Sequence, residues 1–256
     1  MDAYESYNAI LHSGNRSLYQ LAVLSSMLVG GAIIRYDSRN WPLSAPVRYT
    51  VIAAAAIGSL VGCAIPAFFA GGYVGASASD YLLSPKTVLG GILCAFFAVA
   101  LVKRILNISY DTSDAFARGG CLMMAIGRLG CVAQHCCFGV PTQSSLGVSF
   151  GDGVSRLPVQ AIEASLVFLL FAGLHVCHQM NYFQNRRLFI LFACYGFLRF
   201  GLEFLRENVS SEWLGIGFYQ WIALSLFVVG IYQIVVRTTK QRSLGNLRIT
   251  VGEASE

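Results

Sequence analysis

The chain has 256 residues, of which 55% are hydrophobic and 12% are charged. This composition lies outside the range of soluble globular proteins and indicates a membrane protein. The net charge of +5 does not indicate a nucleic-acid partner, because the basic residues follow a membrane topology and form no basic patch.

Seven apolar runs are each long enough to cross a bilayer, which takes about 20 residues. In chain order they cover residues 18–36, 49–72, 86–107, 115–135, 159–180, 187–205 and 215–237. The sequence therefore predicts an all-α, polytopic membrane protein with about seven transmembrane helices, forming a single domain over residues 1–256. Acidic residues and no basic cluster precede the first run, which predicts a retained helix and not a cleaved signal peptide.

Basic residues are divided unequally between the two sides of this predicted bundle. Most of the arginines and lysines flank the first, third and fifth connections or lie in the C-terminal tail, and only Arg16, Lys86, Arg156 and Arg206 lie on the alternate side. By the positive-inside rule, the N-terminus is outside and the C-terminus is cytoplasmic. The connection at about 138–158, rich in Gly, Ser and Pro, is then a long outer loop.

Several predicted helices carry polar residues to this outer level of the membrane. Ionisable residues at membrane depth are costly, and their default interpretation is a lined cavity. Arg128, Cys131 and His135 are separated by three and four residues, which predicts one helical face. Arg199, Glu203 and Arg206 follow the same spacing, and an ion pair would offset the burial of Glu203. The alternatives are a purely structural ion pair for Glu203 and, for Arg206, snorkelling from a helix end.

Six segments together resemble the bacterial prolipoprotein diacylglyceryl transferases. The signature segment is AIGRLGCVAQHCCFGVPT, residues 125–142. The others are LYQLAVLSSMLVGG (18–31), LGGIL (89–93), SRLPVQAIEA (155–164), YGFLRFGLEFLRE (195–207) and GFYQWIALSLFVVGIY (217–232). They occur in the family's order and cover nearly the whole chain.

The resemblance implies a seven-helix fold whose active site faces the outer leaflet of the bacterial inner (plasma) membrane. Enzymes of this family move the diacylglyceryl group of phosphatidylglycerol to the thiol of a lipoprotein precursor cysteine and release glycerol phosphate. We therefore expect a multi-pass lipid transferase without cofactor or metal. Its expected partners are phosphatidylglycerol or a related anionic phospholipid, a lipoprotein precursor and membrane lipids. Such a step needs cations for the phosphate and a base for the thiol.

The family's motif positions transfer onto this chain residue by residue. Arg128 and Arg206 match the two essential arginines, and Glu203 is the acidic residue one turn before Arg206. With His135 they form the predicted catalytic set. The predicted substrate-binding residues are Tyr19, Gly91, Gly130, Gln134, Cys136, Gly139, Gln160, Glu163, Arg199 and Gln220.

The chain also departs from the family pattern. The histidine before Gly-Gly, the family's catalytic base, is Leu89, and the histidine before the Pro-x-Gln element is Leu157. Two asparagines and a glutamate of the signature are Cys131, Gln134 and Cys136. Because leucine cannot take a proton, either another group is the base or the scaffold performs different chemistry. The alternative function is a catalytically divergent or degenerate relative that binds phospholipid or uses another lipid acceptor.

Cys131, Cys136 and Cys137 with His135 leave four interpretations. The first is a zinc or copper site, since thiolates and imidazole suit these metals, although the spacing matches no recognised ligand pattern. The second is a thiol active site in which Cys136 is activated by Arg128. The third makes His135 the replacement base with the cysteines as passive lining. The fourth is structural lining or a disulfide.

Overall fold

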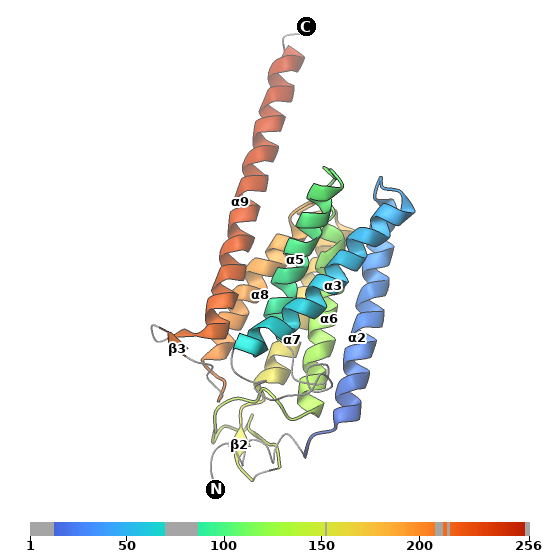
Figure 1. Cartoon of the computed structure of the whole chain (residues 1–256). Coiled ribbons are helices and arrows are strands. Elements are labelled where there is room, and N and C mark those ends of the chain that lie inside the picture. The colour runs from blue at the N-terminus through green and yellow to red at the C-terminus, as the bar shows by residue number, and fades with distance from the viewer. Residues whose placement is uncertain (1–12, 70–86, 152, 208–211, 214–215, 254–256) are drawn as a thin grey trace.

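The computed structural model describes residues 13–69, 87–151, 153–207, 212–213 and 216–253 (Figure 1). Within these ranges the long helices are α2 (Arg16–Asp37), α3 (Ala45–Phe69), α5 (Val88–Ile105), α6 (Ser113–Ala133), α7 (Val159–Gln179), α8 (Arg187–Glu203) and α9 (Phe218–Glu253). A 3-10 turn, η1 (Ser38–Asn40), follows α2. Two antiparallel ribbons pair β1 (Val148–Ser149) with β2 (Ser155–Arg156) and β3 (Glu212–Trp213) with β4 (Ile216–Gly217).

The helical prediction is confirmed, and six helices of the described chain are long and apolar enough to cross a membrane. The remaining predicted span, residues 187–205, corresponds to α8, which has 17 residues and is therefore about 26 Å long. Most of its residues are buried, so neighbouring helices shield it from lipid. The predicted spans 49–72, 86–107 and 215–237 extend partly outside the described residues.

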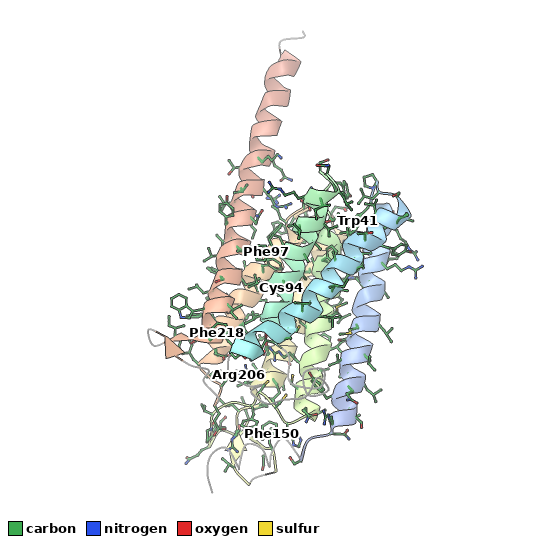
Figure 2. The ribbon with its side chains drawn as sticks, in the orientation of Figure 1. Trp41, Cys94, Phe97, Phe150, Arg206 and Phe218 are labelled. Carbon is green, nitrogen blue, oxygen red and sulfur yellow. The ribbon has the colours of Figure 1, made fainter. Side chains whose placement is uncertain are left out.

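The helices run side by side in alternating directions, and α9 projects beyond the others (Figure 1). The loop of residues 138–158 covers one end of the bundle, called the loop end below. The opposite end, where η1 follows α2, is called the network end. Arg206 and Phe150 lie at the loop end and Trp41 lies at the network end (Figure 2).

Glycines allow α2 and α6 to approach closely. A Cβ added at Gly119 would lie 2.5 Å from the carbonyl oxygen of Gly30 and 2.5 Å from Cγ1 of Ile34. Small residues at such crossings are typical of membrane helices, where van der Waals packing replaces the hydrophobic effect as the cause of association. The position of α6, and of the residues at its end, therefore depends on this contact.

The largest apolar cluster fills the space among α5, α6, α7, α8 and α9. Phe96, Phe189 and Phe192 meet edge to face in it, which is a favourable ring geometry. Leu89 belongs to the same cluster and is 2% exposed. The residue at the family's histidine position is thus a core side chain.

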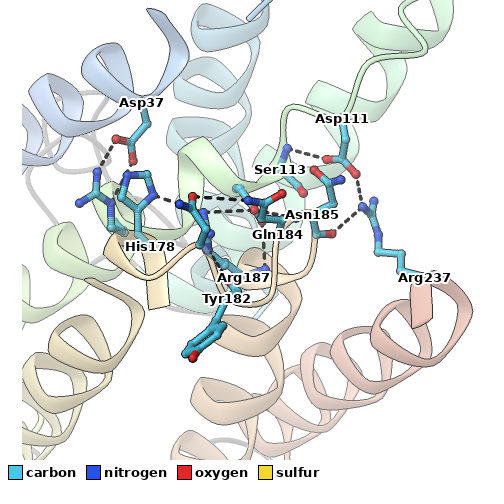
Figure 3. A network of polar contacts seen from close by, with 12 residues as sticks. Asp37, Asp111, Ser113, His178, Tyr182, Gln184, Asn185, Arg187 and Arg237 are labelled. Carbon is cyan, nitrogen blue, oxygen red and sulfur yellow. Dashed lines mark hydrogen bonds and ion pairs between the residues drawn. The ribbon is translucent and has the colours of Figure 1, made fainter. Parts of the chain in front are cut away.

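Buried ion pairs join the helices at the network end (Figure 3). Arg118 pairs with Asp37 and contacts His175 Nδ1 at 2.9 Å, which links α6 to α2 and α7. Asp114 accepts hydrogen bonds from the backbone N–H groups of Asn185 at 2.7 Å and of Arg187 at 3.0 Å. These charges are paired, as burial requires, and they fix the end opposite the cysteines.

Adjacent glycines of α6 provide a test of the α2–α6 contact. We expect Gly119→Ala to lower the free energy of unfolding by about 1–3 kcal/mol, because the added methyl group overpacks the crossing. Gly120→Ala is the matched control, since nothing lies within 4 Å of its added Cβ; it should be neutral or stabilising by up to about 1 kcal/mol. Denaturant unfolding in detergent micelles, followed by far-UV circular dichroism, measures both. Equal stability of the two variants would contradict this account.

Candidate functional site

Arg128, Glu163 and Tyr195 form a buried cluster near the loop end, with one residue from each of α6, α7 and α8. The Nε atom of Arg128 lies 2.9 Å from Oε1 of Glu163. The Tyr195 hydroxyl donates to the same carboxylate oxygen at 2.9 Å, and Nη2 of Arg128 donates to that hydroxyl at 3.5 Å. All three side chains are almost completely buried, so the ion pair is held in a low-dielectric interior where its geometry is fixed.

Glu203 holds two further arginines at the end of α8. Its Oε2 atom lies 2.6 Å from Nη2 of Arg199 and 3.3 Å from Nη1 of Arg206. The shared face predicted for these three residues is confirmed. Arg206 is more exposed than Arg199, so it lies at the rim of the cluster.

Several buried polar atoms of this region lack a hydrogen-bond partner among the described residues. Gln160 is 0% exposed, and neither its amide nitrogen nor its oxygen is bonded. The same holds for Nε and Nη1 of Arg199 and for Oε1 of Glu203. Buried polar groups are normally paired. The guanidinium groups of Arg128, Arg199 and Arg206 face the two carboxylates of Glu163 and Glu203, which leaves one positive charge in excess among these five groups. The unpaired donors therefore suit an anionic, oxygen-rich ligand.

The sulfur atoms of Cys131, Cys136 and Cys137 lie within 4.8 Å of one another at the end of α6. Nη1 of Arg128 approaches Cys131 Sγ at 4.0 Å, and the Cys136 thiol donates to the Cys131 carbonyl at 3.7 Å. Hydrogen bonds from the thiols of Cys131 and Cys136, together with the charges of Arg206 and Arg128, hold the pKa of the Cys137 thiol well below its ordinary value. None of the described cysteines forms a disulfide. The cysteine turn, residues 131–137, thus lies next to the arginine cluster, which consists of Arg128, Arg199 and Arg206.

The prediction that His135 continues the helical face of Arg128 and Cys131 is wrong. Helix α6 ends at Ala133, whose carbonyl accepts the Asn15 N–H at 2.7 Å, and His135 has a left-handed backbone with φ of 54°. Its Nδ1 lies 3.0 Å from Ser13 Oγ, and its ring meets Phe150 edge to face. His135 therefore packs against Phe150 of the loop of residues 138–158 and does not continue the face of Arg128.

The predicted glycines all lie at close packing contacts. Gly130 faces Tyr19 and Ala22 of α2, with 3.3 Å and 3.0 Å between an added Cβ and their nearest atoms. Gly91 faces Cys63 of α3 at 2.6 Å, and Gly139 faces the Leu205 carbonyl at 2.5 Å. A side chain at Gly139 would clash with the backbone, one at Gly91 would require the Cys63 side chain to move, and one at Gly130 would require a shift of a few tenths of an ångström.

The three glutamines predicted to bind substrate lie in different surroundings. Gln134 is the C-cap of α6 and lies against Gly14. Oε1 of Gln220 accepts the Gly217 N–H at 2.8 Å at the start of α9. Gln160 lies one turn before Glu163 on α7, is 0% exposed and has no bonding partner in the described chain.

Two residues of the site were missed by the sequence analysis. Tyr195 lies one turn before Arg199 on the same face of α8, and this spacing was the available signal. Arg156 lies in the predicted outer loop, yet its Nε atom is 2.5 Å from Glu207 and its guanidinium stacks 5.1 Å above the Phe138 ring. It ties the loop to the segment that carries Arg206.

An apolar cavity of about 930 Å³ extends between the α3–α5 pair and the rest of the bundle. Its lining runs from Val88 and Gly91 at one end to Lys103, Arg104 and Arg237 at the other. The volume is at the upper end of the range for ligand pockets, and its walls are mostly hydrocarbon. The cavity is suited to apolar chains.

The fold and the site define a polytopic membrane protein with a buried arginine–carboxylate site at one end and a long apolar cavity. The chain belongs to the prolipoprotein diacylglyceryl transferase family, whose model matches residues 12–236. The family resemblance of the sequence is thereby confirmed.

Similar proteins include phosphatidylglycerol–prolipoprotein diacylglyceryl transferase 2 of Clostridium perfringens (strain 13 / Type A). It is 26% identical over 163 residues, which are 60% of this chain and 63% of the relative. The phosphatidylglycerol–prolipoprotein diacylglyceryl transferase of Dehalococcoides mccartyi (strain ATCC BAA-2266 / KCTC 15142 / 195) is 28% identical over 167 residues, 61% of this chain and 63% of the relative. The enzyme of that name from Leifsonia xyli subsp. xyli (strain CTCB07) is 28% identical over 174 residues, 62% and 52% of the two chains. The matched segment thus spans less than two thirds of each relative.

The burial of Glu163 predicts that removing its charge is costly for stability. We expect Glu163→Gln to lower the free energy of unfolding by about 3–5 kcal/mol, because Arg128 would remain charged and buried without its partner. The matched control is Glu207→Gln, whose carboxylate pairs with Arg156 but is 33% exposed; its cost should be about 1 kcal/mol. Chemical unfolding in micelles measures both, and a cost for Glu163→Gln no greater than that for Glu207→Gln would refute the assignment.

Proposed function

We propose that this protein is a phospholipid-dependent transferase of a bacterial inner membrane. It moves the diacylglyceryl group of phosphatidylglycerol to a lipoprotein precursor cysteine at the outer face. The observation that carries the proposal is the excess of three arginines, Arg128, Arg199 and the partly exposed Arg206, over two glutamates, together with the unpaired donors of Gln160 and Arg199.

The proposed topology has seven crossings, with the N-terminus outside and the C-terminus in the cytoplasm. The unequal distribution of basic residues supports it, as does the alternating direction of the helices (Figure 1). The loop end and its arginine cluster then face the outer leaflet. The network end, with Lys103, Arg104 and Arg237, faces the cytoplasm.

The reaction breaks the bond between the glyceryl carbon and the phosphate oxygen, so negative charge develops on the leaving glycerol phosphate. Arg128 and Arg206 bind the phosphate and stabilise this charge, because preorganised cations in a dry site need no reorganisation. Glu163 and Glu203 hold these guanidinium groups in position. The Gln160 amide and the unpaired Arg199 nitrogens donate to the remaining phosphate oxygens.

The apolar cavity supports the lipid part of the proposal. A diacylglyceryl group brings two long hydrocarbon chains, and the cavity between α3–α5 and the other helices offers a mostly hydrocarbon wall that follows α5 from Val88 to Arg104. The relatives described above are named phosphatidylglycerol–prolipoprotein diacylglyceryl transferases, so phosphatidylglycerol and prolipoprotein are the two substrates in the names of those proteins.

Leu89 is the observation that favours the second candidate, a phospholipid-binding relative without transfer. It lies in the apolar core and has no group that takes a proton. The two functions differ in turnover alone, so a transfer assay decides between them.

Arg206 provides the direct test of transfer. We expect purified wild-type protein in vesicles to move label from phosphatidylglycerol to a cysteine peptide. Arg206→Ala should reduce kcat by about 100- to 1,000-fold, because one donor to the developing charge is lost. Arg39→Ala, at the network end, is the matched control. If folded wild-type protein shows no transfer to either thiol or hydroxyl acceptors, the proposed transferase function is overturned and the phospholipid-binding function remains.

A substitution at Gln160 separates an effect on phosphatidylglycerol binding from an effect on protein stability. We expect Gln160→Leu to be neutral or stabilising, because a buried amide without partners is replaced by an apolar side chain of similar size. Its KM for phosphatidylglycerol should rise by about tenfold, corresponding to one lost hydrogen bond of about 1.4 kcal/mol. Gln179→Leu at the end of α7 is the control. Thermal unfolding and transfer kinetics provide the two readouts, and an unchanged KM would remove Gln160 from the phosphate site.

A further inference from the structure

The cysteine turn has a geometry that the arginine cluster does not require. Three sulfur atoms from a seven-residue segment converge within 4.8 Å. We propose that Cys131, Cys136 and Cys137 bind one zinc ion with an open fourth position, and that the acceptor thiol of the reaction occupies this position. The second half of this inference rests on the proposed function.

The backbone of the turn is arranged to bring two adjacent cysteines to the same side as Cys131. His135 and Cys137 have positive φ values of 54° and 63°, a conformation that costs a residue with a side chain roughly 1–2 kcal/mol. The Cys136 N–H donates to the Cys131 carbonyl at 3.2 Å and closes the turn. Strain of this kind persists where the surrounding structure requires it, and it gathers at functional sites.

The distances suit a zinc ion after small side-chain rotations. Tetrahedral zinc binds thiolate sulfur at about 2.3 Å, which separates two sulfur ligands by about 3.8 Å. The three sulfur atoms already lie within 4.8 Å of one another. Cys136 is buried and the other two are partly buried, so the ion would be enclosed on the side of the bundle.

The donor set selects a thiophilic metal. Within the described chain this group of potential ligands consists of sulfur atoms alone, whereas magnesium and calcium require oxygen. His135 is directed to Ser13 and Phe150, and Glu163 is held by Arg128 and Tyr195.

Charge favours Zn²⁺ over Cu⁺. Three thiolates leave a single negative charge with Zn²⁺ and two with Cu⁺, so zinc needs less compensation from its surroundings. Nη1 of Arg128, 4.0 Å from Cys131 Sγ, is placed as an outer-shell donor to a bound thiolate. Zinc with three protein ligands also keeps the open position typical of catalytic sites.

An open position on zinc supplies what Leu89 lacks. A coordinating thiol loses its proton, which passes to water, and metal coordination activates the nucleophile. The acceptor sulfur then forms a bond to the glyceryl carbon while the bond from that carbon to the phosphate oxygen breaks. The electron pair of that bond leaves on the phosphate held by Arg128 and Arg206. The products are a thioether and glycerol phosphate, and the oxidation state of zinc does not change.

Metal analysis of tag-free protein, purified without chelator, tests the binding site. We expect about one zinc per chain, because the three cysteines form a single ligand set. Replacement by cobalt should produce a thiolate-to-cobalt charge-transfer band. Cys136→Ser should lose the band and most of the metal. Cys194→Ser, an exposed cysteine of α8, should retain both. Zinc-free wild-type protein that gives no cobalt–thiolate spectrum would overturn the site, and bound copper in place of zinc would overturn the assignment of the metal.

Transfer assays on the same wild-type preparation test the role of the ion and do not depend on the folding of a variant. Chelation should reduce transfer by at least about 100-fold, the lower range for loss of an activating group, and added zinc should restore it. Transfer that is unaffected by complete metal removal would overturn the inference and leave the proposed function intact. Loss of transfer in His135→Ala alone, with the cysteine variants active, would make His135 the base. Bound zinc without transfer in any preparation would overturn the proposed function and the role assigned to the ion.

Discussion

The ion pair between Arg128 and Glu163 is the interaction on which the site depends. A guanidinium group at this depth is stable because a carboxylate lies 2.9 Å away and a tyrosine hydroxyl completes the contact. Each partner comes from a different helix, so the relative positions of α6, α7 and α8 are fixed by one electrostatic requirement. The glycine contact between α2 and α6 then determines how far α6 can move toward its neighbour.

Glu203, the last residue of α8, likewise pairs with Arg199 of the same helix and with Arg206, which follows the end of the helix. The two carboxylates are acceptors for cations and leave some of the guanidinium nitrogens without partners. At the network end, Arg118, Arg237 and Arg187 each pair with a different aspartate, Asp37, Asp111 and Asp114. At the loop end, Arg199 and Arg206 instead share the single carboxylate of Glu203, which leaves this cluster with capacity for an anion.

The sequence predicted those features that depend on local spacing and composition. Apolar runs located the helices, and the spacing of Arg199, Glu203 and Arg206 predicted their contact. The end of α6 was not predicted, because the usual mark of a helix end is a glycine with positive φ, and here His135 and Cys137 adopt that conformation. Tyr195 was overlooked in a largely apolar segment, because its one-turn spacing from Arg199 does not reveal a bond to a carboxylate on another helix. The tight contacts of Gly91 and Gly139 depend on elements distant in the chain, so spacing alone did not reveal them.

Ser13 and Asn15 both bond to the end of α6, Ser13 through His135 and Asn15 through the Ala133 carbonyl. Asn15 also caps α2 by accepting the Leu18 N–H. These two residues join the start of α2 to the end of α6. The position of the three cysteines along the bundle consequently depends on the pairing of α2 with α6 and not on the signature segment alone. Transplanting that segment into another helix bundle would not by itself reproduce the site.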